Sequence, residues 1–96
     1  MTHEFYRESD NYERVSEIFK VLAHPVRLQI IRQLLETQTL NVSNLQKSLN
    51  LPQSTVSQHL TKLKQHKIVT HNRKGLEVFY RVEDIQVQQT MGILIF

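Results

Sequence analysis

The sequence predicts one mostly α-helical domain that carries a single β-hairpin near its carboxyl end. Its 96 residues suffice for one modest hydrophobic core and are too few for two. Apolar residues recur at helical spacing in five segments. After residue 67 they alternate instead with the period of two that strands show. We find no internal repeat and no linker, so residues 1–96 are expected to form one domain.

The first helix is expected over residues 9–22. Apolar side chains recur there at the helical period: Tyr12, Val15, Phe19 and Leu22. Asp10, followed three residues later by Glu13, resembles a capping box, although aspartate replaces the usual serine or threonine. Residues 1–8 are polar and are expected to be frayed.

Pro25 marks the next boundary, because proline ends one helix and is tolerated in the first turn of the next. The second helix is therefore expected from Pro25 to about Glu36, and its many apolar residues place it centrally in the core. Asn41 suits the N-cap of a short helix over Val42–Leu49. Leu40 just before it can add a short piece of strand.

The stretch 51–65 is the most informative part of the chain. Val56, Leu60 and Leu63 form a narrow apolar stripe at helical period. The remaining face carries uncharged side chains that both donate and accept hydrogen bonds: Gln53, Ser54, Ser57, Gln58 and Thr61. A helix that only needed solubility would more often show Glu and Lys there, whereas base edges require donors and acceptors. The alternative is an ordinary amphipathic helix with a Ser/Gln-rich exposed side.

Charge is unevenly distributed along the chain. The formal net charge is +3, yet no Asp or Glu occurs from Thr37 to Leu76. That window holds six Lys and Arg residues, whereas residues 1–20 carry five acidic residues against three basic ones. A basic patch of this kind is the electrostatic footprint of a polyanion. The alternative is a chance run of neutral residues.

A β-hairpin is expected after Lys67, with strands over 68–72 and 76–82. Arg73, Lys74 and Gly75 lie between the strands, and glycine supplies the positive φ that a tight hairpin requires. One face of the hairpin is expected to carry alternating apolar residues: Leu76, Val78, Tyr80 and Val82. The two cations at the tip suit contact with a phosphate backbone or a minor groove. A plain structural hairpin with a soluble tip is the alternative.

The last helix is expected over residues 84–96, with Glu83 and Asp84 complementing the dipole of its first turn. Its end is apolar: Met91, Ile93, Leu94, Ile95 and Phe96. Exposed apolar surface costs about 25 cal/mol per Å², so this tail must cover its own core or that of a second copy. The small size of the domain favours the second copy.

Several classes of protein are disfavoured. The absence of cysteine excludes disulfides and thiolate sites. No signal peptide and no membrane-length apolar run is visible, so we expect a cytoplasmic protein without membrane contact. The chain shows no glycine-rich phosphate loop and no pairing of a nucleophile with a base. It is therefore not expected to be an enzyme.

Three segments together resemble the ArsR/SmtB family of winged helix-turn-helix repressors. Val21–Ile30 is similar to the family's L-A-x-P-x-R-L-x-I segment, and Ser54–Leu60 is similar to its S-x-V-S-x-H-L segment. Asn72–Leu76 followed by Tyr80 is similar to its wing. The resemblance extends from about residue 15 to residue 94. It implies a homodimer joined through residues 9–22 and 84–96 that binds an inverted repeat of double-stranded DNA. A protein-interaction module on the same scaffold is the alternative.

The resemblance also implies roles for particular residues. Base reading falls on Gln53, Ser54, Ser57 and Gln58. Contacts with the DNA backbone fall on Thr55, Thr61, Lys62, Arg73 and Lys74. The dimer interface falls on Tyr12, Phe19, Val87, Met91 and Leu94.

Metal sensing is not expected. Where some family members have a Cys-x-Cys pair, this chain has Asn41 and Ser43. Other members hold zinc between their last helices through Asp, His and Glu. Asp84 is present here, but no histidine follows His71. No two histidines are spaced i, i+4 on one helix, and His24 is expected to cap or pack. We therefore predict no metal and no cofactor, and leave any small-molecule effector open.

Overall fold

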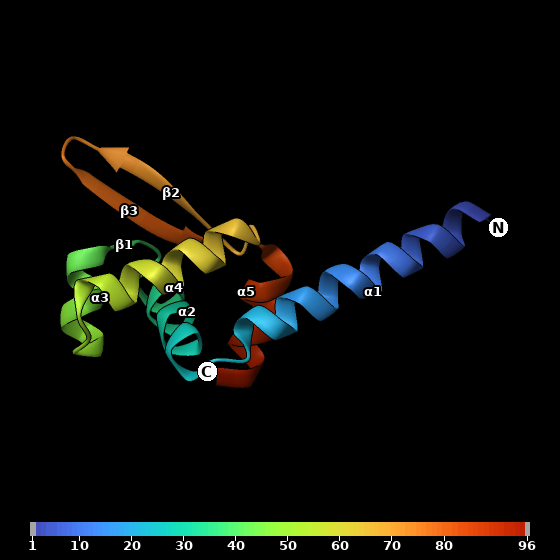
Figure 1. Cartoon of the computed structure of the whole chain (residues 1–96), viewed down its shortest axis with the longest axis horizontal. Coiled ribbons are helices and arrows are strands. Elements are labelled where there is room, and N and C mark those ends of the chain that lie inside the picture. Colours follow the sequence, from blue (N-terminus) through green and yellow to red (C-terminus); the bar gives the residue numbers. More distant parts are fainter. Residues whose placement is uncertain (1, 96) are drawn as a thin grey trace.

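The computed structural model describes residues 2–95, with side chains from residue 11 onward. The described residues form five helices and a small antiparallel sheet, and the hairpin of that sheet projects away from the helices (Figure 1). The elements in chain order are α1 (Thr2–Leu22), α2 (Pro25–Thr37), β1 (Leu40–Asn41), α3 (Val42–Leu49), α4 (Gln53–Gln65), β2 (Val69–Lys74), β3 (Glu77–Val82) and α5 (Ile85–Ile95). The expected fold class and order of elements are confirmed.

Helix α1 is longer than expected. It begins at Thr2 rather than near residue 9, and its amino-terminal half extends away from the rest of the chain (Figure 1). Asp10 therefore lies inside the helix and does not cap it. Residues 2–22 contain no glycine or proline, so nothing local interrupts the helix where polar composition had suggested fraying.

Helix α2 is central in the core, as expected. His24 is its N-cap, with Nδ1 accepting a hydrogen bond from the Val26 N–H at 3.2 Å. Ile30, Ile31 and Leu34 are buried on the inner face of the helix. The expectation that His24 caps or packs is therefore confirmed.

Helices α3 and α4 form the expected helix-turn-helix. Asn41 caps α3, because its Oδ1 accepts the Asn44 N–H at 2.8 Å. Asn50 ends α3 in the left-handed conformation, φ 54°, which asparagine tolerates better than most residues. Helix α4 then follows Pro52 without a side-chain cap. Its three apolar anchors are fully buried, as the sequence predicted: Val56, Leu60 and Leu63.

The sheet has the strand order β1-β3-β2. In the hairpin Lys74 pairs with Glu77, so Gly75 and Leu76 form a two-residue turn, and Gly75 has the required positive φ of 65°. The expectation that Leu76 begins the second strand on the apolar face is wrong. It lies in the turn and is 98% exposed, because the register pairs residue 74 with 77 and leaves residue 76 unpaired.

Arg14 joins three parts of the chain beside α5. Its Nη1 donates to the His66 carbonyl at the end of α4 at 2.7 Å. Its Nη2 lies 3.1 Å from Asp84 Oδ2. The other carboxylate oxygen of Asp84 accepts the Val87 N–H at 3.0 Å and so caps α5. One arginine on α1 thus fixes the end of α4 relative to the start of α5.

A residue other than glycine with positive φ lies directly after α2, directly after α3 and two residues after α4. These residues are Gln38 (72°), Asn50 (54°) and Lys67 (58°). Such residues stop a helix without glycine, at a steric cost that asparagine bears more easily than glutamine or lysine.

Candidate nucleic-acid interface

The polar side of α4 faces outward. Gln53, Ser54 and Gln58 are exposed, and Ser57 and Thr55 are half-buried. The glutamines therefore project away from the core that Val56, Leu60 and Leu63 fill. This arrangement gives one helix a buried apolar stripe and an exposed neutral face able to donate and accept hydrogen bonds.

Two of the residues expected to contact the DNA backbone, Thr55 and Thr61, are only partly available to a partner. The Thr61 hydroxyl donates to the Ser57 carbonyl at 2.9 Å. This bond leaves the oxygen of Thr61 free to accept and removes its proton from outside contacts. Thr55 is only half exposed at the start of the helix. Of the four residues expected to read bases, Gln53, Ser54 and Gln58 are therefore the exposed ones.

Exposed cations occur on α4 itself and on the hairpin that follows it. Lys62 is exposed on α4, and Arg73 and Lys74 are exposed on the hairpin that follows. We call this hairpin, residues 69–82, the wing. The Lys74 ammonium lies 5.7 Å from the centre of the Phe79 ring, which is within the range of a cation–π contact. The wing thus holds its cation near a fixed aromatic face.

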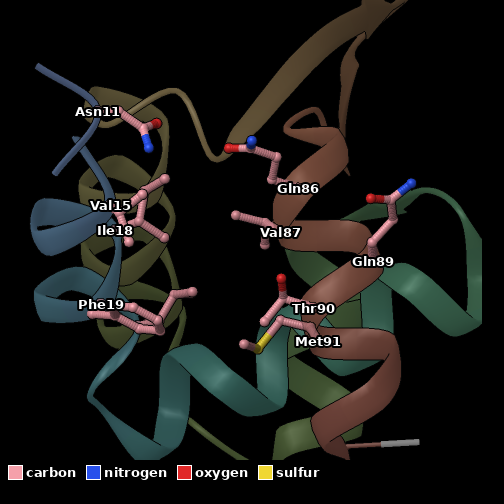
Figure 2. Close-up of a pocket in the computed structure, with 10 residues that line it drawn as sticks. Asn11, Val15, Ile18, Phe19, Gln86, Val87, Gln89, Thr90 and Met91 are labelled. Carbon is pink, nitrogen blue, oxygen red and sulfur yellow. The ribbon is translucent and has the colours of Figure 1, made fainter. Parts of the chain in front are cut away.

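A second candidate surface lies between α1 and α5, where an apolar groove encloses about 250 Å³. Figure 2 shows Val15, Ile18 and Phe19 of α1 across from Val87 and Met91 of α5. Amide side chains stand at the rim: Asn11, Gln86 and Gln89. The groove is therefore apolar at its floor and polar at its edge, as protein–protein contact surfaces are.

The expected dimer residues divide into two groups. Tyr12, Phe19 and Leu94 are 70%, 57% and 65% exposed and are available to a partner. Val87 and Met91 are only 2% and 3% exposed within one protomer, and they lie at the floor of the groove, so their place in a dimer interface stays a prediction. They occur four residues apart on α5, on the stripe that packs against the chain's own core. Phe96, expected in the apolar tail, lies outside the described residues.

The exposed apolar residues of α5 also include Ile93 (83%), which belongs to the apolar tail expected to meet a second copy, and Ile85 (66%), which the interface prediction omitted. The sequence carried a signal for them. Val87, Met91 and Ile95 are spaced i, i+4, i+8, so one face of α5 is complete without Ile85 and Ile93. The remaining apolar residues of α5 must then form a second face.

No three histidine, aspartate or glutamate side chains come together among the described residues in a way that could hold a metal. Asp84, the acidic residue at the family's zinc position, instead contacts Arg14 and caps α5. Within the described part of the chain, no helix combines the length and apolar character needed to cross a membrane.

A pair that the sequence-based prediction missed lies behind α4. Arg27 Nε donates to His59 Nδ1 at 3.2 Å, and the His24 and His59 rings are 4.5 Å apart. Arg27 and His59 occur in the two segments that most resemble the ArsR/SmtB family. Sequence alone gave no reason to bring them into contact, because 32 residues separate them.

The helix-turn-helix, the wing and the outward polar face of α4 define a winged helix-turn-helix protein. Comparison with known proteins agrees with this class. A helix-turn-helix domain model matches residues 22–72. The transcriptional repressor PagR of Bacillus anthracis is 42% identical over 79 residues, which are 82% of this chain and 79% of PagR. The repressor SmtB of Mycobacterium tuberculosis is 44% identical over 72 residues, 75% of this chain and 53% of SmtB.

Solved structures agree as well. The crystal structure of PagR superimposes with a TM-score of 0.84 at 40% identity and covers 90% of this chain and 98% of its own. Reduced HlyU from Vibrio cholerae gives a TM-score of 0.85 at 31% identity, with 92% of each chain covered. The chain belongs to the ArsR/SmtB family of winged helix-turn-helix transcriptional regulators. These relatives are regulators by name, which supports the expectation that the chain is not an enzyme.

Proposed function

We propose that this chain is a homodimeric regulator that binds specific sequences of double-stranded DNA and acts chiefly as a repressor. The observation that carries the proposal is the exposed face of α4, which carries uncharged donors and acceptors together with the exposed cation Lys62. The acid-free window from Thr37 to Leu76 supports it, because carboxylates would repel the phosphates on either side of a groove. A DNA partner also supports a cytoplasmic location.

In this proposal α4 is the recognition helix and enters the major groove. Glutamine pairs naturally with adenine, since its amide can donate to N7 and accept from N6 at the same time. Gln53 and Gln58 are exposed amides in the first half of α4 and are assigned to base reading, with Ser54 beside them. Ser57 is half-buried and is therefore the least accessible of the four base-reading residues.

The lysines and the wing supply affinity without sequence preference. Lys62, Arg73 and Lys74 are exposed and contact phosphates, and Thr55 and Thr61 add hydroxyls along the same backbone. Each phosphate that a cation neutralises releases counterions, so binding weakens as salt rises. Phosphate contacts of this kind position the protein, and the base contacts give it specificity.

The dimer is proposed from the apolar surface of the terminal helices. Phe19 on α1 and Ile93 and Leu94 on α5 are more than half exposed, and water is a poor environment for such side chains. A related Mycobacterium bovis domain, 25% identical with a TM-score of 0.82, is described as homodimeric. A two-fold dimer would present two recognition helices about 34 Å apart, one turn of DNA, which matches an inverted repeat.

Repression is the favoured outcome because PagR and SmtB are named repressors. The related HlyU of Vibrio cholerae, 32% identical over 84 residues, is named an activator. The same DNA-binding surface can serve either outcome, since the position of the site relative to the promoter decides whether bound protein blocks transcription. We therefore infer DNA binding from the fold of this chain, and we attribute repression to the position of the bound DNA site relative to the promoter.

The experiment that tests the proposal is genomic footprinting of the native protein, followed by fluorescence anisotropy on the recovered site over a salt series. We expect the recovered site to bind more tightly than random duplex at every salt concentration. Light scattering in the same buffers should give the mass of a dimer. If the folded protein bound random and recovered duplex equally well, the proposal would fail. Binding of a heterologous protein at high salt without DNA binding would instead favour an interaction module.

A further inference from the structure

The inner side of α4 is held by a polar contact as well as by its apolar stripe. His59 follows Gln58 directly and is half-buried. Its Nδ1 accepts a hydrogen bond from Arg27 Nε at 3.2 Å. Arg27 Nη1 donates in turn to the Val21 carbonyl at 3.0 Å. One guanidinium on α2 therefore ties the carboxyl end of α1 to the middle of α4.

His24 completes the cluster from the connection between α1 and α2. Its ring centre lies 4.5 Å from that of His59, with the ring planes inclined at 57°. The position of His24 is itself fixed, because its Nδ1 accepts the Val26 N–H as the cap of α2. His59 thus lies between an anchored ring and an anchored guanidinium.

This contact adds a directional constraint to the one that the apolar stripe provides. Val56, Leu60 and Leu63 are fully buried and determine which side of α4 faces the core. A hydrogen bond weakens steeply as its angle departs from linearity. The bond between Arg27 and His59 therefore narrows the range of rotation of α4 about its axis. That rotation sets the direction of Gln58, the preceding residue.

The contact also depends on the protonation state of His59. Nδ1 can accept from Arg27 only in the neutral imidazole, whose remaining proton is then on Nε2. A protonated ring has N–H groups at both nitrogens, and one of them would point at the guanidinium. Burial, then His24, then Arg27 lower the pKa of His59 below 6.5, so the ring is neutral at pH 7. Lys62, three residues further along α4, is exposed.

We propose that Arg27 and His59 form a positioning pair for the recognition helix, and that acid weakens sequence-specific DNA binding by protonating His59. The proposal rests on the proposed function. Neither residue touches DNA; the pair acts through the orientation of Gln58 and its neighbours. His66 and His71 are titratable as well and lie near the wing.

The sign of the pH effect follows from the direction of the pKa shift. Because folding lowers the pKa of His59, the contribution of the pair to stability is fully present above pH 6.5. It is lost as the pH falls from there through the lower pKa of the folded chain. We expect the affinity for the specific site to fall about fivefold over this range, the change that one hydrogen bond supplies.

The test compares three substitutions by fluorescence anisotropy between about pH 7.5 and about pH 5.5, the range in which histidine titrates. His59→Gln keeps an acceptor and cannot titrate, so we expect near wild-type affinity that no longer falls in acid. His59→Leu removes the acceptor and should bind about fivefold more weakly at every pH. His71→Gln, the matched control, removes an exposed histidine and should keep the acid-induced loss. A His59→Gln variant that lost affinity in acid as the wild type does would overturn the proposal.

A second readout needs no DNA. Nitrogen NMR of the wild-type dimer should show His59 protonated on Nε2 at neutral pH, and the α4 amide signals should shift as His59 titrates. The same signals should stay fixed in His59→Gln. If α4 amides were insensitive to the titration of His59, the positioning role would be lost, whatever the DNA result. If the pair behaved as expected but no duplex bound, the proposed function would fail and the positioning pair would stand.

Discussion

Helices α4 and α5 are alike in how they are held and unlike in what they expose. Each uses apolar residues at helical spacing to seat itself on the core: Val56, Leu60 and Leu63 on α4, and Val87 and Met91 on α5. The outer face of α4 carries neutral amides and hydroxyls beside lysines, whereas that of α5 carries Ile85, Ile93 and Leu94. The buried stripe of each helix determines how the helix packs on the core, and the chemistry of its exposed face indicates which kind of partner it binds.

The largest effect should come from placing a charge on the outer face of α5. Leu94 is 65% exposed, so Leu94→Glu should leave the folded protomer intact. In a two-fold dimer the change occurs twice, and burying a large apolar side chain is worth about 1.5–3 kcal/mol. Association should weaken by about twice that amount. Light scattering would show monomers, and affinity for the inverted repeat would fall with them.

Gln29→Glu is the matched control for that change, because it adds the same charge at an exposed position of α2. It should remain dimeric. If Leu94→Glu remained dimeric at micromolar concentration, α5 would not supply the dimer contact. The exposed faces of α4 and α5 would then differ in composition without the proposed difference in binding partner.

An intermediate effect is expected on the outer face of α4. Gln53→Ala or Gln58→Ala should cost about 1–3 kcal/mol of binding to the specific site and relax the preference at one base pair. Gln65→Ala, an exposed glutamine at the end of the same helix, is the control and should change neither. A panel of site variants in a gel-shift assay measures both quantities. Unchanged preference in both mutants would remove these glutamines from base reading.

The smallest effect should come from the wing. Lys74→Ala should weaken binding to all sequences alike and flatten the salt dependence by about one unit of slope, as the loss of one phosphate contact requires. Lys20→Ala removes the same charge from α1, where Lys20 lies 3.6 Å from Glu17, and should leave the slope unchanged. Anisotropy over a salt series distinguishes them. Equal slopes for Lys74→Ala and the wild type would exclude Lys74 from phosphate contact.

Most of the fold was predictable because its boundaries carry local chemistry. Asn41 was expected at the N-cap of α3 and occupies it, and Pro25 begins α2 as its fixed φ predicts. The stripe of Val56, Leu60 and Leu63 predicted which side of α4 is buried, and so which side is free. These signals lie within one or two helical turns and can be read without knowledge of distant contacts.

The errors and omissions have a different origin. The start of α1 was misplaced because polarity is a weaker signal than the absence of a helix breaker. Periodicity shows that α5 has apolar residues but not which of its two apolar faces covers the core, and within one protomer Val87 and Met91 lie on the face that does. The pair of Arg27 and His59 joins residues far apart in sequence, and only tertiary structure brings them together.

The two residues with positive φ near the ends of α2 and α4 are positions where a substitution should increase stability. Gln38 and Lys67 hold positive φ angles of 72° and 58°, a conformation that side chains other than glycine adopt at a cost of about 1–2 kcal/mol. Both positions are exposed and neither belongs to a contact surface proposed above. Glycine there would relieve the steric conflict, so heat resistance could be raised independently of regulation, as expected for a natural chain that holds only the stability it needs.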